Sequence, residues 1–140
     1  MGGRGAGKSV ILVDRKEVEK KLDEVTRIHV KLRDCYLPCI SCGASWSPEF
    51  EAGHFHTRGA HPKLKFNIKN IHAQCKKCNG SESGNKVGFK KGIAERYGAQ
   101  ALRELEKLPL TAQTKTNWEM CEDIKILSEL NKQLRGSIKT

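Results

Sequence analysis

Apolar residues recur at three- and four-residue steps in two stretches near opposite ends of the chain. In residues 14–34 and again in residues 116–136, a stripe of apolar side chains lies opposite a charged face. Thr116 and Glu119 have the spacing of a capping box at the start of the second stretch. We therefore predict two long amphipathic helices. Their stripes are Val18, Leu22, Val25, Ile28 and Leu32 in the first and Trp118, Cys121, Ile124, Leu127, Leu130 and Leu134 in the second.

Shorter elements fill the region between these helices. Residues 51–74 suggest two short strands joined by a loop that contains Gly and Pro, and a Cys-rich knuckle follows them. Two short helices, broken at Gly98, come next. The pattern predicts an α+β fold in which a small central core is flanked by amphipathic helices. We divide the chain into a flexible Gly-rich N-terminus (1–13), an N-terminal helix (14–34), a central core (35–92) and a C-terminal helical region (93–140).

The positive charge of the chain is concentrated in one segment. The net charge is +10, and residues 54–91 contribute +8 of it, from nine basic residues against the single acid Glu82. Such a patch favours a polyanionic partner, with nucleic acid first among them. We expect these side chains to contact the phosphate backbone rather than the bases, with affinity that falls steeply with salt. They are Arg58, Lys63, Lys65, Lys69, Lys76, Lys77, Lys86, Lys90 and Lys91.

Four of the six cysteines form two Cys-x-x-Cys pairs, "CISC" and "CKKC", which consist of Cys39, Cys42, Cys75 and Cys78. Two such knuckles complete the tetrahedral S4 set of a structural zinc ion. Disulfides are less favoured in a chain expected to be cytosolic, and a redox Cys-x-x-Cys occurs once rather than twice. Cys121 lies on the apolar stripe of the last helix and is expected to be a core residue, whereas Cys35 is a spare thiol.

Polar residues that suit phosphodiester chemistry lie between the two cysteine pairs. A His near the end of the first strand and an Asn in the second suit a one-metal cleavage site. In such a site a neutral imidazole takes a proton from water, a divalent ion stabilises charge on the phosphate, and an Asn holds the imidazole or the loop. The candidates are His54, His56, His61, Asn67, Asn70 and His72, with Asn79 directly after the last cysteine.

The motifs "LPCISCG", "AGHF", "LKFNIKNIHAQC", "CNGSESGN" and "WEMCEDIK" resemble the phage NinG, or Rap, recombination endonuclease family. That family is similar in turn to the HNH, or His-Me finger, nucleases, which have a ββα-metal fold that zinc knuckles often brace. The resemblance runs from about residue 33 to about residue 135. It implies a structure-selective DNA endonuclease that acts on branched recombination intermediates such as Holliday junctions and D-loops.

The resemblance also implies roles for individual residues. His54 is the general base, Asn70 orders the hairpin and the base, and Asn79 is a ligand of a catalytic Mg²⁺ or Mn²⁺ ion. The four paired cysteines bind structural zinc. The chain departs from the wider HNH pattern at Gly53, where many members have an Asp, and at Asn79, where many have a His. Glu82 or Asn85 is expected to supply a further oxygen to the ion.

Several alternatives accompany this interpretation. A zinc-stabilised DNA-binding module without cleavage fits the same basic segment. His56 and His61 are candidates for contact with phosphate or solvent, His72 for orienting DNA or packing beside the knuckle, and His29 for a structural role. Symmetric cutting of a junction calls for two active sites, which favours a homodimer.

The run "GGRGAGKS" between Gly2 and Ser9 fits a P-loop pattern, but only Met1 precedes it, so a preceding strand is absent and no nucleotide is expected there. No apolar run suits a membrane span, and no membrane partner is expected. We therefore expect a cytoplasmic location, in the host cell if a phage encodes the chain.

Overall fold

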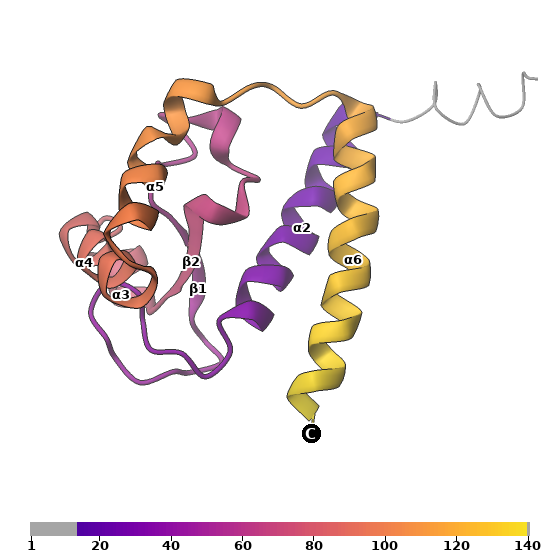
Figure 1. Ribbon diagram of the computed structural model, residues 1–140. Helices are drawn as coiled ribbons and strands as arrows, with labels where there is room; N and C mark the ends of the chain where they lie inside the picture. The colour runs from indigo at the N-terminus through magenta and orange to yellow at the C-terminus, as the bar shows by residue number, and fades with distance from the viewer. Residues whose placement is uncertain (1–13, 140) are drawn as a thin grey trace, which may run out of the picture.

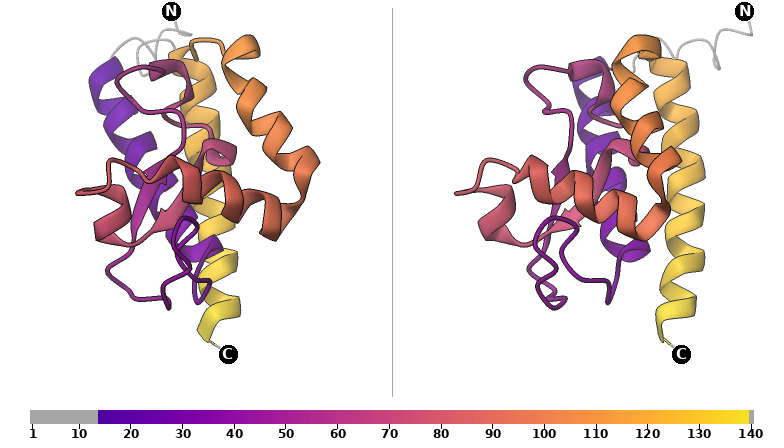
Figure 2. Two further views of the ribbon diagram at one scale, coloured as in Figure 1. Left: turned by 90° about the vertical axis from the view of Figure 1, so that its left-hand side faces the viewer. Right: turned by 60° about the vertical axis from the view of Figure 1, so that its left-hand side comes forward.

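The computed structural model describes residues 14–139, and they form three layers (Figures 1 and 2). Two long helices pair on one side, a two-stranded antiparallel sheet lies in the middle, and three shorter helices cover the other side. The mixed α+β class predicted from the sequence is confirmed. The elements are α2 (Arg15–Arg33), β1 (Glu51–His54), the 3-10 turns η1 (Pro62–Leu64) and η2 (Ile68–Asn70), β2 (Ile71–Gln74), α3 (Lys76–Asn79), α4 (Lys86–Tyr97), α5 (Ala99–Thr111) and α6 (Asn117–Lys139).

The predicted capping box at the start of α6 is confirmed. The Thr116 backbone N–H donates to Glu119 Oε1 at 2.8 Å, and the Glu119 backbone N–H donates to Thr116 Oγ1 at 3.1 Å. These bonds satisfy two of the donors that a helix N-terminus leaves unpaired. At α2 the equivalent role falls to Asp14, whose side chain accepts from the Lys16 N–H at 3.3 Å.

Helices α2 and α6 pack against each other along their apolar stripes. Their shared core consists of Val18, Leu22 and Val25 from α2 with Met120 and Leu127 from α6, and Cys121 and Ile124 pack at its edge. The expectation that Trp118 belongs to the stripe is wrong, because its side chain is 66% exposed. Met120 is fully buried instead, so the inward face of α6 is rotated from the predicted one.

The two strands pair in a fixed register, with Glu51 opposite Gln74 and Gly53 opposite His72. An isolated two-stranded hairpin is only marginally stable in water. Here the end of α2 satisfies the free edge of β2. The Asp34 carboxylate accepts from the Ala73 N–H at 2.9 Å, and Arg33 donates to the Ile71 carbonyl oxygen at 2.6 Å.

A second core holds α4 and α5 against the sheet side of the molecule. It contains Ile40, Phe55, Phe89, Ile93 and Leu105. Helix α4 approaches the backbone of the first cysteine pair so closely that a Cβ at Gly92 would lie 1.8 Å from the Ile40 carbonyl oxygen. Glycine is therefore required there. The boundary predicted between residues 92 and 93 falls inside α4.

No helix within residues 14–139 combines the length and the apolar character needed to cross a membrane. The P-loop-like run between Gly2 and Ser9 and the predicted N-terminal segment 1–13 lie outside the described residues.

Candidate functional site

The two cysteine pairs meet at the base of the hairpin. The Sγ atoms of Cys39, Cys42, Cys75 and Cys78 all lie within 4.8 Å of one another. Cys42 Sγ and Cys75 Sγ are 3.8 Å apart. A tetrahedral zinc ion has thiolate ligands at about 2.3 Å, which places neighbouring sulfurs at this kind of separation. The cluster is thus one that can bind a zinc ion.

Local backbone geometry prepares these sulfurs for a metal. Backbone N–H groups point at them, with Cys75 N 3.3 Å from Cys39 Sγ and Cys78 N 3.5 Å from Cys75 Sγ. Burial of the Cys39 thiol favours its neutral form, but backbone hydrogen bonds from Cys42 and Cys75 outweigh it and lower the pKa of Cys39 to about 7. Because the thiolate is the form that binds metal, the environment of Cys39 favours coordination, whereas burial raises the pKa of Cys78 to about 12.

Asn85 belongs to the cysteine cluster. Its Nδ2 group donates to Cys78 Sγ at 3.3 Å, and its Oδ1 atom accepts from the Gly88 N–H at 3.2 Å, where it caps α4. Both ends of this side chain therefore have partners. Glu82 is the alternative to Asn85 as a further ligand of a catalytic ion, and it is exposed on the turn after α3. No side-chain hydrogen bond joins Glu82 to Asn79 in the described chain.

His54 ends β1 and is held by the loop that follows it. Its Nε2 atom lies 2.9 Å from the Lys65 carbonyl oxygen. Since a carbonyl oxygen only accepts, Nε2 carries the proton and Nδ1 keeps its lone pair. Burial lowers the pKa of His54, and the Lys65 hydrogen bond and Asp23 oppose this shift while Arg58 adds to it. The lowered pKa favours the neutral imidazole, and Nδ1 has no hydrogen-bond partner among residues 14–139.

Asn70 fixes the same loop from inside. Its side chain is fully buried. Oδ1 accepts from the His56 N–H at 2.8 Å, and Nδ2 donates to the carbonyl oxygens of His56 at 3.0 Å and Leu64 at 3.3 Å. The structure therefore brings His54 and Asn70 to one loop, where the amide holds the backbone that carries the imidazole.

Asn79 makes its side-chain hydrogen bond with the start of β1. Its Nδ2 atom donates to Glu51 Oε1 at 2.9 Å. No hydrogen bond joins Asn79 to His54 or Asn70 in the part of the chain described here. Glu51 was not recognised from the sequence, although its position two residues before Gly53 puts both on one face of the strand. That alternation was the available signal.

The other polar residues predicted between the two cysteine pairs have structural contacts. His56 is buried, and its Nε2 atom bonds the Leu105 carbonyl oxygen at 2.8 Å. His72 is buried against Phe89 and Tyr97, and Asn67 caps η2 by accepting from the Lys69 N–H at 2.9 Å. His61 is half-buried beside His56, with ring centroids 5.1 Å apart.

His29 lies in the interface between α2 and α6, where its Nδ1 atom is 3.1 Å from Asn131 Oδ1. This contact confirms its expected structural role.

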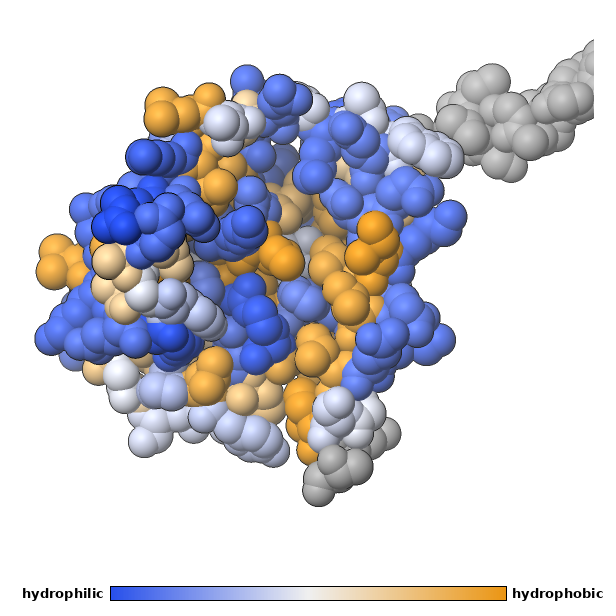
Figure 3. Space-filling view, in the orientation of Figure 1, coloured by the Kyte–Doolittle hydropathy of each residue, from blue (hydrophilic) through white to orange (hydrophobic). Residues whose placement is uncertain are grey.

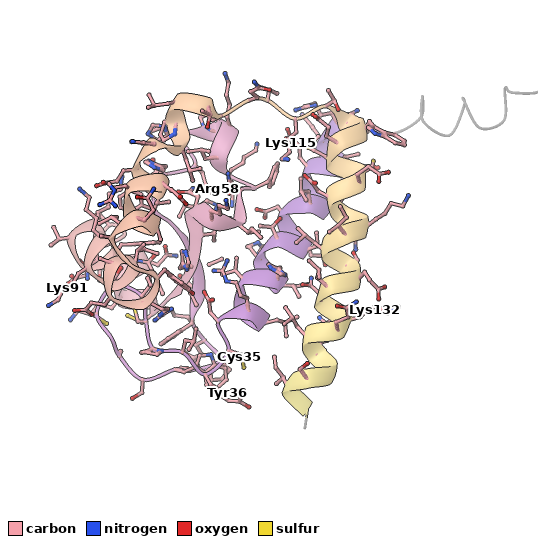
Figure 4. All side chains as sticks on the ribbon, in the orientation of Figure 1. Cys35, Tyr36, Arg58, Lys91, Lys115 and Lys132 are labelled. Carbon is pink, nitrogen blue, oxygen red and sulfur yellow. The ribbon has the colours of Figure 1, made fainter. Side chains whose placement is uncertain are left out.

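The basic side chains are largely available to solvent. Eight of the nine predicted contacts are exposed, and Lys65 is half-buried. Arg58 pairs with Asp23 of α2 at 3.2 Å, and Lys91 lies on the side of the molecule away from α6 (Figure 4). Lys65, Lys76 and Lys90 also form ion pairs. Within the described residues, those without an ion pair are Lys63, Lys69, Lys77, Lys86 and Lys91.

These features define a small α+β protein whose hairpin is clamped by a four-cysteine cluster and carries a basic surface. A family model described as the bacteriophage lambda NinG protein matches residues 7–139. The chain belongs to this phage family.

Protein NinG of Escherichia phage lambda is 41% identical over 87 residues, which cover 62% of this chain and 43% of that protein. The NinG protein of Salmonella phage P22 gives the same values. That of Enterobacteria phage H19B is 36% identical over 121 residues, 84% of this chain and 58% of that protein. The chain thus spans about half the length of these relatives. No solved structure matches the chain.

Proposed function

We propose that this protein is a metal-dependent DNA endonuclease that cuts branched recombination intermediates, with His54 as general base. The observation that carries the proposal is the Nε2 contact of His54 with the Lys65 carbonyl oxygen at 2.9 Å. In the neutral imidazole this contact places the proton on Nε2 and leaves the Nδ1 lone pair available, which is the state a general base requires. The order β1, loop, β2, α3, in which the second cysteine pair lies at α3, supports an HNH-like ββα core.

In the proposed reaction Nδ1 of His54 accepts a proton from a water molecule as its oxygen attacks the scissile phosphorus. The phosphorus–oxygen bond to the leaving group then breaks. A bound Mg²⁺ or Mn²⁺ ion would stabilise negative charge on the phosphate and the leaving oxygen. Asn70 acts as a positioning residue, because its hydrogen bonds hold the loop from His56 to Leu64. The cysteine cluster, when loaded with zinc, braces the hairpin and takes no part in the chemistry.

Exposed lysines around the hairpin would bind the phosphate backbone. Lys77 of α3 and Lys69 of η2 have no ion-pair partner among residues 14–139, so their charge is available to DNA. Contacts of this kind position a duplex without reading its sequence. Selectivity would then come from the shape of the branched substrate, because several duplex arms can reach a basic surface at once.

A homodimer is the form we propose for symmetric cutting, since the two strands need two active sites. Apolar side chains of α6, including Ile126 and Leu130, remain exposed and line a pocket in the surface. Figure 3 shows apolar side chains along this helix beside a hollow. They are available for an interface. A single chain bound to a junction, measured by light scattering, would contradict this part of the proposal.

The decisive experiment compares the unmodified protein, His54→Ala and His61→Ala on a labelled four-way junction and on matched linear duplex, with Mg²⁺ or Mn²⁺. His61 is the control because it lies on the same loop and its side chain makes no hydrogen bond in the described chain. We expect cleavage of the junction to vanish only in His54→Ala while binding persists in all three. Tight binding without cleavage by the unmodified protein would instead establish a zinc-stabilised DNA-binding module.

A further inference from the structure

Three side chains with oxygen atoms lie on one face of the hairpin, and two of them have no role in the site described above. We propose that Glu51, Gln74 and Asn79 form a divalent-cation site. The inference rests on the proposed nuclease function, because it assigns ligands to the ion that function needs. Glu51 and Gln74 are new to the site, and they lie directly opposite each other in the strand register.

Gln74 supplies the most specific observation. Its side chain is fully buried, and its Nε2 group donates to Ser41 Oγ and to the Gly84 carbonyl oxygen, both at 2.7 Å. These two acceptors fix the orientation of the amide. Its Oε1 atom is buried and has no hydrogen-bond partner among the described residues. A buried acceptor left unpaired costs about 1–3 kcal/mol, so such groups usually have a ligand or a water molecule.

Glu51 and Asn79 border the same face and are half-buried, so a hydrated ion can reach them from solvent. Asn79 Nδ2 donates to Glu51 Oε1 at 2.9 Å. This bond aligns the two side chains and uses neither Asn79 Oδ1 nor Glu51 Oε2. A carboxylate together with two amide oxygens is a donor set that suits Mg²⁺ or Mn²⁺, which keep part of their water shell.

The same geometry explains why residue 53 is a glycine. A Cβ at Gly53 would lie 1.7 Å from Gln74 Oε1. A side chain at this position, including the Asp of the wider HNH pattern, would displace the Gln74 oxygen. Gln74 and Glu51 therefore take the part that a carboxylate at position 53 would otherwise play.

The cysteine cluster positions this donor set. Gln74 directly precedes Cys75, and Asn79 directly follows Cys78. The Asn79 backbone N–H also donates to the Cys75 carbonyl oxygen at 3.0 Å. An ion bound to the sulfurs would thus hold both amide ligands at fixed places on either side of the second knuckle. Lys76 and Lys77 are the first two residues of α3 and would attract the phosphate that completes the coordination shell.

The test is a Mn²⁺ titration of the zinc-loaded full chain. Electron paramagnetic resonance measures binding as the decrease of the free Mn²⁺ signal. Glu51→Gln keeps an acceptor for Asn79 but removes the charge, and affinity for this kind of site depends on ligand charge, so we expect Mn²⁺ binding at least about tenfold weaker. Glu49→Gln is the control, because Glu49 is an exposed residue close to Glu51 in the sequence and its substitution removes the same charge. Asn79→Asp should tighten binding.

Equal Mn²⁺ affinity in Glu51→Gln and the unmodified protein, or no binding by the unmodified protein, would overturn the inference. Thermal melting of each variant establishes that it is folded. Junction cleavage measured on the same samples separates this inference from the nuclease proposal. Mn²⁺ binding that depends on Glu51 without any cleavage would support the cation site and contradict the nuclease. Cleavage that is unchanged in Glu51→Gln would support the nuclease and contradict the site.

Discussion

His54 Nε2 and the Lys65 carbonyl oxygen are 2.9 Å apart across the loop that joins the two strands. This contact selects one tautomer of a side chain whose other nitrogen has no hydrogen-bond partner within residues 14–139. It also ties the end of β1 to the loop that carries the basic residues. A change in that loop therefore acts on the imidazole as well as on DNA binding.

The first prediction concerns the pKa of His54, measured by NMR titration of its ring protons. Burial lowers it, so we expect a value below the ordinary 6.5. Asp23→Asn removes a charge that raises this pKa and should lower it further, whereas Arg58→Gln removes a charge that lowers it and should raise it. If His54 is the base, the acid side of the pH–rate profile should follow these shifts in the same direction. A His54 pKa above 6.5 would contradict the burial argument.

The second prediction concerns the loop anchor. Asn70→Ala removes three hydrogen bonds of a fully buried side chain and leaves the His56 N–H unpaired, so we expect a loss of about 2–4 kcal/mol in the free energy of unfolding. Asn67→Ala is the control, because it removes only the single capping bond to the Lys69 N–H and should cost about 1 kcal/mol. Urea denaturation measures both. Equal losses would show that Asn70 does not anchor the loop.

The helical layers could be predicted from the sequence because their apolar periodicity is strong. The capping residues Thr116 and Glu119 and the break at Gly98 were both visible as local signals. The rotation of α6 could not be predicted, because Trp118 fits the apolar stripe and Met120 lies next to it. Only the packing on α2 decides that Met120 is buried.

The candidate site could be predicted only where the spacing of residues along the sequence implies which of them meet. The two Cys-x-x-Cys pairs imply their own convergence, and the four sulfurs do meet. The partner of Asn79 depends instead on strand register, because Glu51 reaches it only when β1 and β2 pair as observed. The hydrogen bond from Asn85 to Cys78 likewise depends on the conformation of the turn after α3, which the sequence spacing does not predict.

The third prediction concerns metal removal. We expect one zinc ion per chain, and Cys39→Ser should lose it and destabilise the hairpin, because the cluster joins residues far apart in the sequence. Cys121→Ser is the matched control, since that thiol packs at the edge of the core between α2 and α6 and lies outside the cluster. Zinc content by elemental analysis and melting with a chelator measure both effects. Equal zinc content in the two variants would contradict the assignment.

The fourth prediction concerns the salt dependence of DNA binding. Lys77→Gln removes an exposed charge without an ion pair in the described chain. If Lys77 contacts a phosphate, the plot of log binding constant against log salt concentration should become less steep, by about 0.9 in the magnitude of its slope. Lys125→Gln is the control, because Lys125 lies on α6 and pairs with Glu122 at 3.6 Å. Binding of a junction at several salt concentrations measures the slope. The same slope in both variants would place Lys77 outside the interface.

The fifth prediction concerns stability at acid pH. His72 is buried, and burial together with Arg33 lowers its pKa to about 4, although Asp34 opposes the shift. The unfolded chain, with a His pKa near 6.5, binds this proton first as the pH falls. The folded state should therefore lose about 3 kcal/mol between pH 6.5 and pH 4 from this group, and nothing above pH 6.5.

His72→Gln keeps a polar side chain at this position and cannot take up that proton. Its free energy of unfolding should consequently depend less on pH between 6.5 and 4 than that of the unmodified protein, whatever contribution the cysteine cluster makes to both. Denaturation at a series of pH values gives the slopes. If His72→Gln and the unmodified protein show the same slope, the buried imidazole is not the group that makes the fold sensitive to acid.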